Sequence, residues 1–172
     1  MQYHEPEEIM WQGNFVTAKR QGKWEYVSRS RGIKAAVILA VEDGHVLLVE
    51  QFRVPLGKNC IELPAGLIGD QTKGEDPLEA AGRELEEESG YRAAKLESLG
   101  EYYSSPGMVS ESFTLVRATG LTKISEGGGV EGEGIIPHRV ALNQLTDFID
   151  TKRAEGCGID VKLLLLLGAQ LI

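Results

Sequence analysis

The sequence is poor in the residue types that mark several common kinds of protein. Its two cysteines, Cys60 and Cys157, form no metal-ligand spacing, which argues against a zinc site and favours small apolar packing roles. Its strongest apolar run, Leu163 to Leu167, reaches at most from Ile159 to Ile172 and is too short to cross a bilayer. We therefore expect no membrane-spanning segment, and a helix packed on the core instead.

Basic residues are also scarce. Lysine and arginine total 18 against 26 aspartates and glutamates, a net charge of −8, which argues against binding to a nucleic-acid backbone. The first ten residues, Met1 to Met10, show neither the basic stretch nor the cleavage site of a secretory signal, which predicts a cytoplasmic protein. The length suits one domain, so residues 1–172 are expected to form a single unit.

What the chain holds in excess is carboxylate, concentrated between Glu75 and Glu88. This acidic run has clear helix signals at both ends. Asp76 is a candidate N-cap, Pro77 suits the first helical position, and Gly90 suits the position just after the last turn. The sequence therefore predicts a helix whose two ends are defined.

Three glutamates of this helix, Glu84, Glu87 and Glu88, are spaced i, i+3 and i+4 and so share one face. Like charges at that spacing repel each other, and the simplest reading of such a run is a solvated acidic surface. A cation that prefers oxygen ligands, Mg²⁺ or Mn²⁺, would convert the repulsion into binding. One rigid helix with three carboxylates can hold more than one such ion.

The same residues carry a resemblance to a known family. The motif G-x5-E-x7-R-E-U-x-E-E-x-G-U, in which U is apolar or aromatic, is matched at every fixed position by Gly69, Glu75, Arg83, Glu84, Leu85, Glu87, Glu88, Gly90 and Tyr91. This motif is the Nudix box, so the chain resembles the Nudix hydrolases. The resemblance implies a metal centre that cleaves diphosphates.

The glycine that opens the box has two candidates. In the pyrophosphatases that this chain resembles, it lies in a P-A-G-L-I segment, which is Pro64 to Ile68 here. Counting from Gly66 leaves eight residues before Glu75 rather than five. Either Gly69 takes the role, or the loop from Gly69 to Gly74 carries three extra residues. A polar loop accepts added length at little cost, so we favour the insertion.

Hydrophobic alternation and turn residues predict the other elements. Strands are expected at Asn14–Lys19, Lys23–Arg29, Lys34–Val41, His45–Phe52, Leu96–Tyr103, Ser112–Arg117 and Ile135–Arg139, with helices at Leu142–Ala154 and Val161–Leu171. The dipeptides Gln21-Gly22 and Asp43-Gly44 mark hairpin turns. This order predicts an α+β protein, which is compatible with the α/β/α sandwich that the Nudix resemblance implies.

Residues 1–30 precede the expected core of residues 31–172 and are predicted to form a small antiparallel β segment. In the pyrophosphatases that the chain resembles, such a segment helps to build a dimer, so we expect a homodimer. The aromatic side chains of this segment are Trp11, Phe15, Trp24 and Tyr26. They are expected to form the core of the small sheet, or one of them to line the partner's adenine site.

Three segments outside the box resemble the ADP-ribose pyrophosphatase branch: E-Q-x-R at Glu50–Arg53, E-x-P-A-G at Glu62–Gly66 and S-P-G-x-x-x-E at Ser105–Glu111. The last is also compatible with an ordinary Pro-Gly turn. The resemblance implies hydrolysis of ADP-ribose to AMP and ribose 5-phosphate. Other nucleotide sugars or dinucleotides as substrates, and a nucleotide sensor without catalysis, are the alternatives.

Several side chains in these segments suit contacts to a small nucleoside diphosphate substrate. The planar guanidinium of Arg53 suits stacking on adenine or forking onto phosphate. Main-chain amides around Gly107 and Met108 can approach a phosphate because glycine has no Cβ. The carboxylate of Glu111 can accept hydrogen bonds from ribose hydroxyls.

The resemblance also implies the mechanism. Mg²⁺, with Mn²⁺ as a substitute, is expected on Glu84, Glu87 and Glu88 and on the main-chain oxygen of Ala65. Arg83 is expected to orient Glu87, and Glu75 to fix the preceding loop rather than to bind metal.

The base that takes a proton from the attacking water is expected outside the helix. The glycine-rich segment from Ser125 to Gly134 suits a mobile lid, and its stretch from Glu131 to Ile135 resembles the E-x-E-x-I stretch that closes over substrate in ADP-ribose pyrophosphatases. Glu131 is the predicted base, with Glu133 as the runner-up or an assisting metal ligand. A disordered acidic turn without a role is the alternative.

Overall fold

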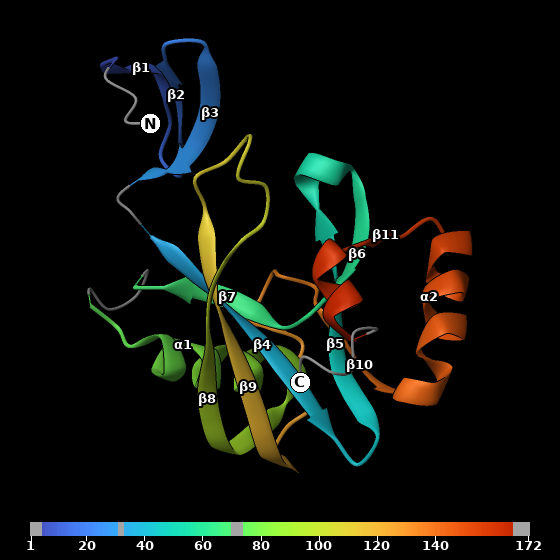
Figure 1. The fold of residues 1–172 in the computed structure, drawn as a ribbon. Coiled ribbons are helices and arrows are strands. Elements are labelled where there is room, and N and C mark those ends of the chain that lie inside the picture. Colours follow the sequence, from blue (N-terminus) through green and yellow to red (C-terminus); the bar gives the residue numbers. More distant parts are fainter. Residues whose placement is uncertain (1–4, 31–32, 70–73, 167–172) are drawn as a thin grey trace.

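The computed structural model describes residues 5–30, 33–69 and 74–166. These residues form two β-sheets with flanking helices (Figure 1). The strands are β1 (Glu7–Gln12), β2 (Val16–Gln21), β3 (Trp24–Arg29), β4 (Lys34–Glu42), β5 (His45–Arg53), β6 (Lys58–Glu62), β7 (Ala65–Ile68), β8 (Tyr91–Tyr103), β9 (Ser112–Lys123), β10 (Ile136–Ala141) and β11 (Gly158–Ile159). The helices are α1 (Pro77–Glu84), the π turn η3 (Leu85–Ser89) and α2 (Leu145–Ala154), with 3-10 turns at Val54–Leu56, Leu142–Gln144 and Val161–Leu166.

The N-terminal strands form a separate antiparallel sheet in the order β1-β2-β3, set apart from the main body in Figure 1. This confirms the small β segment. The sequence predicted β2 and β3 but not β1, whose six residues are all exposed and therefore show no hydrophobic alternation. The hairpin between β2 and β3 turns at Gly22, which has a φ of 57°.

The main sheet runs in the order β11-β6-β5-β4-β9-β8, with β10 paired to β5 and β7 paired to β4. Strand β4 is central: it runs parallel to β9 and antiparallel to β5 and β7. The β4–β5 hairpin turns at Asp43 and Gly44, both with positive φ (50° and 69°), as a two-residue turn of this dipeptide requires. The predicted hairpin is confirmed.

Two apolar layers cover the two faces of this sheet. Alternate residues of β4 point in opposite directions. Ala36 and Ile38 pack with the box helix, which consists of α1 and η3, whereas Val37 and Leu39 pack with apolar side chains of α2. Helix α1 and helix α2 therefore lie on opposite faces, and the α/β/α sandwich is confirmed (Figure 1).

The predicted helix Val161–Leu171 is wrong in type over its described part. Residues Val161–Leu166 form a 3-10 turn, in which the Leu163 amide donates to the Asp160 carbonyl at 3.1 Å. The Asp160 carboxylate also accepts from the Lys162 amide at 2.7 Å, which fixes this tight start. The rest of the predicted helix lies outside the described residues.

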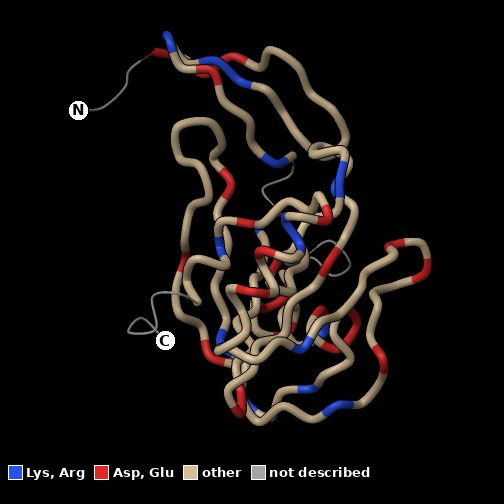
Figure 2. The backbone as a smooth tube through the Cα atoms, turned by 90° about the vertical axis from the view of Figure 1, so that its right-hand side faces the viewer, with Lys and Arg blue, Asp and Glu red and all other residues tan. Residues whose placement is uncertain are grey.

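Acidic and basic residues are interspersed along the backbone, and the view in Figure 2 shows no extended basic stretch. In the described ranges, no helix is both long enough and apolar enough to span a membrane. Cys60 is buried and Cys157 is half-buried, and both are free thiols. Burial raises the pKa of the Cys60 thiol to about 11, which fits a packing role.

Candidate active site

The acidic helix begins and ends at the residues that the sequence predicts, but its last turn is wider than an α-helical turn. The Asp76 carboxylate accepts a hydrogen bond from the Leu78 amide at 2.8 Å, and Pro77 is the first helical residue. After Glu84 the helix widens into the π turn η3, and Gly90 ends it with a φ of 77°. The expectation of a regular helix is therefore wrong in its last turn, which is the turn that carries Glu87 and Glu88.

Arg83 links the carboxylates at the centre of the box. Its Nη1 lies 2.7 Å from Glu84 Oε1 and 3.4 Å from Glu87 Oε2, and its Nε lies 3.4 Å from Glu75 Oε1. The other oxygen of Glu75 accepts a hydrogen bond from the Gly69 amide at 3.0 Å. Glu75 thus holds the loop before the helix, and Arg83 balances the charge of the neighbouring glutamates.

Glu88 is the buried carboxylate of the set. Its Oε2 accepts a hydrogen bond from the Ala65 amide on β7 at 2.9 Å, so it points from the helix toward the sheet. Burial raises the pKa of Glu88 to about 8; the Ala65 bond and the charge of Arg53 oppose this rise, while the charges of Glu84 and Glu133 add to it. Burial is the main cause of this rise, and the carboxylates of the box helix and of the glycine-rich loop add to it.

The two candidate box glycines have different surroundings. A Cβ on Gly66 would fall 1.9 Å from the Cδ atom of Glu84, so β7 can lie against this carboxylate only with glycine at that position. Gly69 has a φ of 80° and supplies the amide that holds Glu75. The insertion predicted in the loop from Gly69 to Gly74 falls largely on residues 70–73, which lie outside the described residues.

The donor set suits a divalent cation. Among the residues that the structure describes, no three His, Cys, Asp or Glu side chains lie together as a group that could hold a metal ion by itself. Mg²⁺ is usually held by one or two carboxylates together with waters and substrate phosphates, so an open set of glutamates fits it. The raised pKa of buried Glu88, caused first by burial and also by its carboxylate neighbours, is relieved when a cation binds there.

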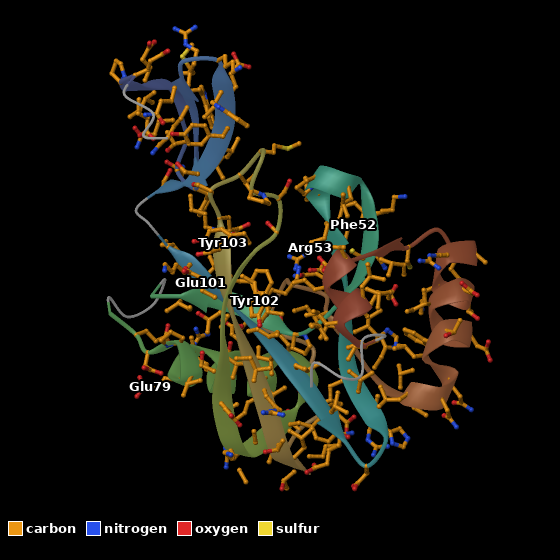
Figure 3. The ribbon with its side chains drawn as sticks, viewed as in Figure 1. Phe52, Arg53, Glu79, Glu101, Tyr102 and Tyr103 are labelled. Carbon is orange, nitrogen blue, oxygen red and sulfur yellow. The ribbon has the colours of Figure 1, made fainter. Side chains whose placement is uncertain are left out.

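Arg53 is held rigidly by a residue to which the sequence assigned no role. Its Nε and Nη2 donate to the two carboxylate oxygens of Glu62 at 2.6 Å and 2.9 Å, and Glu62 is buried. In Figure 3, Arg53 projects from the end of β5 toward the side of the molecule that carries Tyr102. This pair of bonds occupies one edge of the guanidinium and fixes the orientation of its plane. In the sequence, Glu62 could have been found as the first glutamate of the E-x-P-A-G segment.

The S-P-G segment packs against the N-terminal sheet. Val27 on β3 donates to the Met108 carbonyl at 2.9 Å and accepts from the Ser110 amide at 3.0 Å. The Met108 amide donates to the Ser105 carbonyl at 3.0 Å, which is the hydrogen bond of a Pro-Gly turn. Gly107 lines a cavity of about 350 Å³ together with Trp24, Tyr26 and Pro106.

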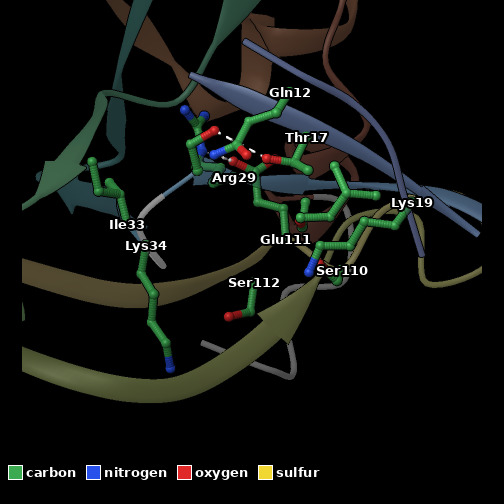
Figure 4. A pocket seen from close by; sticks show the side chains of 12 residues that line it. Gln12, Thr17, Lys19, Arg29, Ile33, Lys34, Ser110, Glu111 and Ser112 are labelled. Atoms are coloured by element: carbon green, nitrogen blue, oxygen red, sulfur yellow. Dashed lines mark hydrogen bonds and ion pairs between the residues drawn. The ribbon is translucent and has the colours of Figure 1, made fainter. Parts of the chain in front are cut away.

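Glu111 faces a second cavity, of about 460 Å³, between the N-terminal sheet and the main body (Figure 4). Its Oε1 accepts from Nε of Arg29 at 2.5 Å, and both residues line this cavity. Thr17 and Ser30, whose hydroxyls lie 3.1 Å apart, belong to the same lining. The sequence did not indicate Arg29, because its partner is far away along the chain.

The N-terminal aromatic residues are not the core of the small sheet. The exposed fractions are 59% for Trp11, 69% for Phe15 and 49% for Trp24. The prediction is wrong for these three side chains, because a small three-stranded sheet offers little to bury them against, whereas Tyr26 is half-buried. Several large apolar side chains therefore remain on the surface of this part of the chain.

The glycine-rich loop carries both predicted bases on its surface. Glu131 and Glu133 are exposed, and the Oε2 atom of Glu133 accepts a hydrogen bond from the Val130 amide at 2.9 Å. Of the two, Glu133 is the one whose charge contributes to the raised pKa of Glu88. The loop reaches the box helix through its main chain, because the Gly129 amide donates to the Glu87 carbonyl at 2.9 Å.

Glu50 is a buried polar centre that sequence reasoning missed. Its carboxylate accepts from Asn59 at 2.8 Å and lies 3.1 Å from His138 and 3.0 Å from the Lys152 ammonium; Cys157 Sγ is 3.7 Å away. Burial alone raises the pKa of Glu50, but the hydrogen bonds from Asn59, Lys152 and His138 outweigh burial and lower it to about 2. Glu50 ties β5 to β6, β10 and α2.

A sequence model of the NUDIX domain matches residues 30–152 of this chain. The chain is 39% identical over 119 residues to a methanol dehydrogenase activator from Bacillus methanolicus, covering 69% of this chain and 63% of that protein. It is 41% identical over 91 residues to an ADP-ribose pyrophosphatase from Bacillus subtilis, covering 53% of this chain and 48% of that protein. The chain thus spans about half to two-thirds of the length of these two relatives.

Two further similarities cover more of both partners. A GDP-mannose pyrophosphatase from Cronobacter sakazakii is 36% identical over 146 residues, which cover 80% of this chain and 72% of that protein. A crystal structure of an ADP compounds hydrolase superposes with a TM-score of 0.70 at 25% identity, covering 96% of this chain and 91% of that one. The similarity therefore extends over both sheets and the box helix.

Proposed function

The chain belongs to the Nudix family, and from this membership we propose that it hydrolyses the diphosphate bond of a nucleoside diphosphate derivative, with ADP-ribose as the preferred substrate. The products of that reaction are AMP and ribose 5-phosphate. One observation carries the proposal. Arg83 Nη1 joins the carboxylates of Glu84 and Glu87, at 2.7 Å and 3.4 Å, beside buried Glu88, whose Oε2 accepts from the Ala65 amide at 2.9 Å.

We propose Mg²⁺ as the cofactor, with Mn²⁺ as a substitute. Glu84, Glu87 and Glu88 would hold it, joined by the main-chain oxygen of Ala65. A cation bound there neutralises diphosphate charge and makes the attacking water more acidic. Arg83 contributes by holding Glu84 and Glu87 on the same side of the helix, at 2.7 Å and 3.4 Å.

The protein side chains then handle the proton and the substrate. Glu131 is the proposed base, and Glu133 is the second candidate, supported by its electrostatic effect on Glu88. Arg53, fixed by Glu62, offers its planar face to adenine. Gly107 is proposed to approach the phosphates.

The N-terminal sheet supports the proposal of a homodimer. Trp11, Phe15 and Trp24 leave apolar surface uncovered, and surfaces of this kind mark interaction sites. Trp24 and Tyr26 also line the cavity beside the S-P-G segment, so aromatic rings on which adenine can stack are available there. Glu111, already paired with Arg29 at 2.5 Å, is the proposed acceptor for ribose hydroxyls.

A second substrate class has its own support. The Cronobacter sakazakii GDP-mannose pyrophosphatase aligns with more of this chain than the Bacillus subtilis ADP-ribose pyrophosphatase does. A GDP-sugar is therefore the second candidate. A nucleotide sensor without catalysis is disfavoured, because Glu84, Glu87 and Glu88 are all present and buried or half-buried.

The test is a panel assay with purified protein, Mg²⁺ and a coupled phosphatase. We expect kcat/KM for ADP-ribose to exceed that for GDP-mannose, diadenosine polyphosphates and NADH, because a polar site rejects substrates that leave its groups unpaired. Chelation of the metal should abolish turnover, and Mg²⁺ should restore it. A GDP-mannose kcat/KM about tenfold above that for ADP-ribose would reverse the assignment. Binding of nucleotides without any turnover would support the sensor.

A further inference from the structure

The first half of the glycine-rich loop is bound to the C-terminal end of the box helix. The Gly128 amide donates to the Glu88 carbonyl at 2.9 Å, and the Gly129 amide donates to the Glu87 carbonyl at 2.9 Å. The last carbonyl groups of a helix find no N–H donor within the helix and need donors from outside it. Here the loop supplies two of these donors.

The contact is too close for any side chain to lie between the two segments. A Cβ on Gly127, which has a φ of 68°, would fall 2.5 Å from the carbonyl carbon of Ser89 and 2.6 Å from the Glu88 carbonyl oxygen. From the other side, a Cβ on Gly90 would fall 2.2 Å from the Ser125 carbonyl oxygen. The neighbours on both sides are backbone atoms, which do not move aside as a flexible side chain would.

We propose that Gly127, Gly128 and Gly129 are positioning residues, which dock the loop on the helix backbone and so set where Glu131 and Glu133 stand over the carboxylates of Glu87 and Glu88. This inference rests on the proposed function, because it concerns the base and the metal ligands named there. It assigns to these glycines a defined geometric role in place of general flexibility.

The docking couples the two halves of the site through single residues. Glu87 and Glu88 bind the loop through their main-chain carbonyls and offer their side chains to the cation. On the loop side, the Glu133 carboxylate accepts from Val130, the residue next to Gly129, at 2.9 Å. A shift of the docked segment therefore moves the loop carboxylate relative to the helix carboxylates.

The test compares two glycines with nearly the same backbone conformation. Gly127→Ala adds strain at a φ of 68° and a collision with the helix backbone, whereas Gly44→Ala adds strain at a φ of 69° with nothing within 4 Å of the new Cβ. We expect Gly127→Ala to lower kcat by about a hundredfold, as misplacement of a reacting group by about an ångström does, with KM changed by less than about threefold. The Gly44→Ala control should keep the wild-type kcat and lose similar thermal stability.

A second readout does not depend on activity. A glutamate-specific protease should cut Gly127→Ala after Glu131 or Glu133 about tenfold faster than wild type, because the loop is released from the helix. In the wild-type protein, hydrogen exchange at the Gly128 and Gly129 amides should be clearly slower than at Gly132. The hydrogen-exchange measurement uses the wild-type protein, so it tests the docking even if Gly127→Ala fails to fold.

Equal exchange at these amides, or wild-type kcat with wild-type proteolysis in Gly127→Ala, would overturn the docking role. Absence of turnover in the wild type with protected amides would instead refute the proposed function and leave the docking in place. A fall in kcat of the same size in Gly44→Ala would show that general destabilisation is responsible.

Discussion

Removal of the charge on Glu50 is expected to destabilise the fold strongly at neutral pH. Glu50→Gln keeps the size of the side chain but leaves the Lys152 ammonium, 3.0 Å away, without its buried partner. The Glu50 side chain is only 7% exposed, so water screens this interaction poorly. Against an ordinary value of 4.5, a pKa of about 2 corresponds to about 3 kcal/mol of folding free energy.

The pH dependence follows from the direction of this shift. The pKa of Glu50 is lower in the folded state than in the unfolded state, so its contribution is complete above about pH 5 and is lost as the pH falls toward 2. The free-energy difference between wild type and Glu50→Gln should therefore shrink from about 3 kcal/mol at pH 7 to about 2 kcal/mol at pH 3.5.

Urea denaturation of both proteins at several pH values measures this difference, and at pH 7 it corresponds to a fall in Tm of about 6–12 °C. The matched control is Glu155→Gln, because Glu155 pairs with the same Lys152 at 2.9 Å but is 53% exposed. That control should lose less than about 1 kcal/mol. A loss below about 1 kcal/mol in Glu50→Gln, or a difference that stays constant down to pH 3.5, would refute the reasoning.

The remaining predictions concern the site. Glu88→Gln should lose most activity. Its metal-free Tm, measured by calorimetry, should equal or exceed that of wild type, because burial already disfavours the charged form of Glu88. A clear fall in Tm would mark Glu88 as structural. Mutation of the base to Gln should lower kcat by about a hundred- to ten-thousandfold with substrate still bound; if Glu131→Gln and Glu133→Gln each keep more than about a tenth of kcat, the base lies elsewhere. Gly66→Ala should lower kcat by at least about tenfold at near-normal Tm, because the added Cβ would fall 1.9 Å from the Glu84 side chain. A wild-type kcat in steady-state kinetics would contradict this.

Features that depend on neighbouring residues were predictable from the sequence. The Asp76 cap, the Pro77 start and the Gly90 end of the helix follow from local backbone chemistry, and the structure confirms each one. The Asp43-Gly44 turn is of the same kind, because both residues tolerate positive φ.

Features that depend on distant partners were not predictable. Strands β6 and β7 have only five and four residues, which is too short to show the alternation that marks a half-buried strand. The pairing of Arg53 with Glu62 depends on the register of β5 and β6. Docking of Gly128 on Glu88 requires the folded sheet to bring residues 40 positions apart together.

The π turn has a consequence for insertions and deletions in this chain. Side chains around a helix are separated by a fixed angle per residue, so a change of one residue between Glu84 and Gly90 would turn Glu87 away from Arg83 and Glu88 away from the Ala65 amide. The loop before the helix is tied to it by the bond from the Gly69 amide to Glu75 at 3.0 Å, ahead of the first helical residue. We therefore expect an added residue before Glu75 to be tolerated better than an added residue between Glu84 and Gly90.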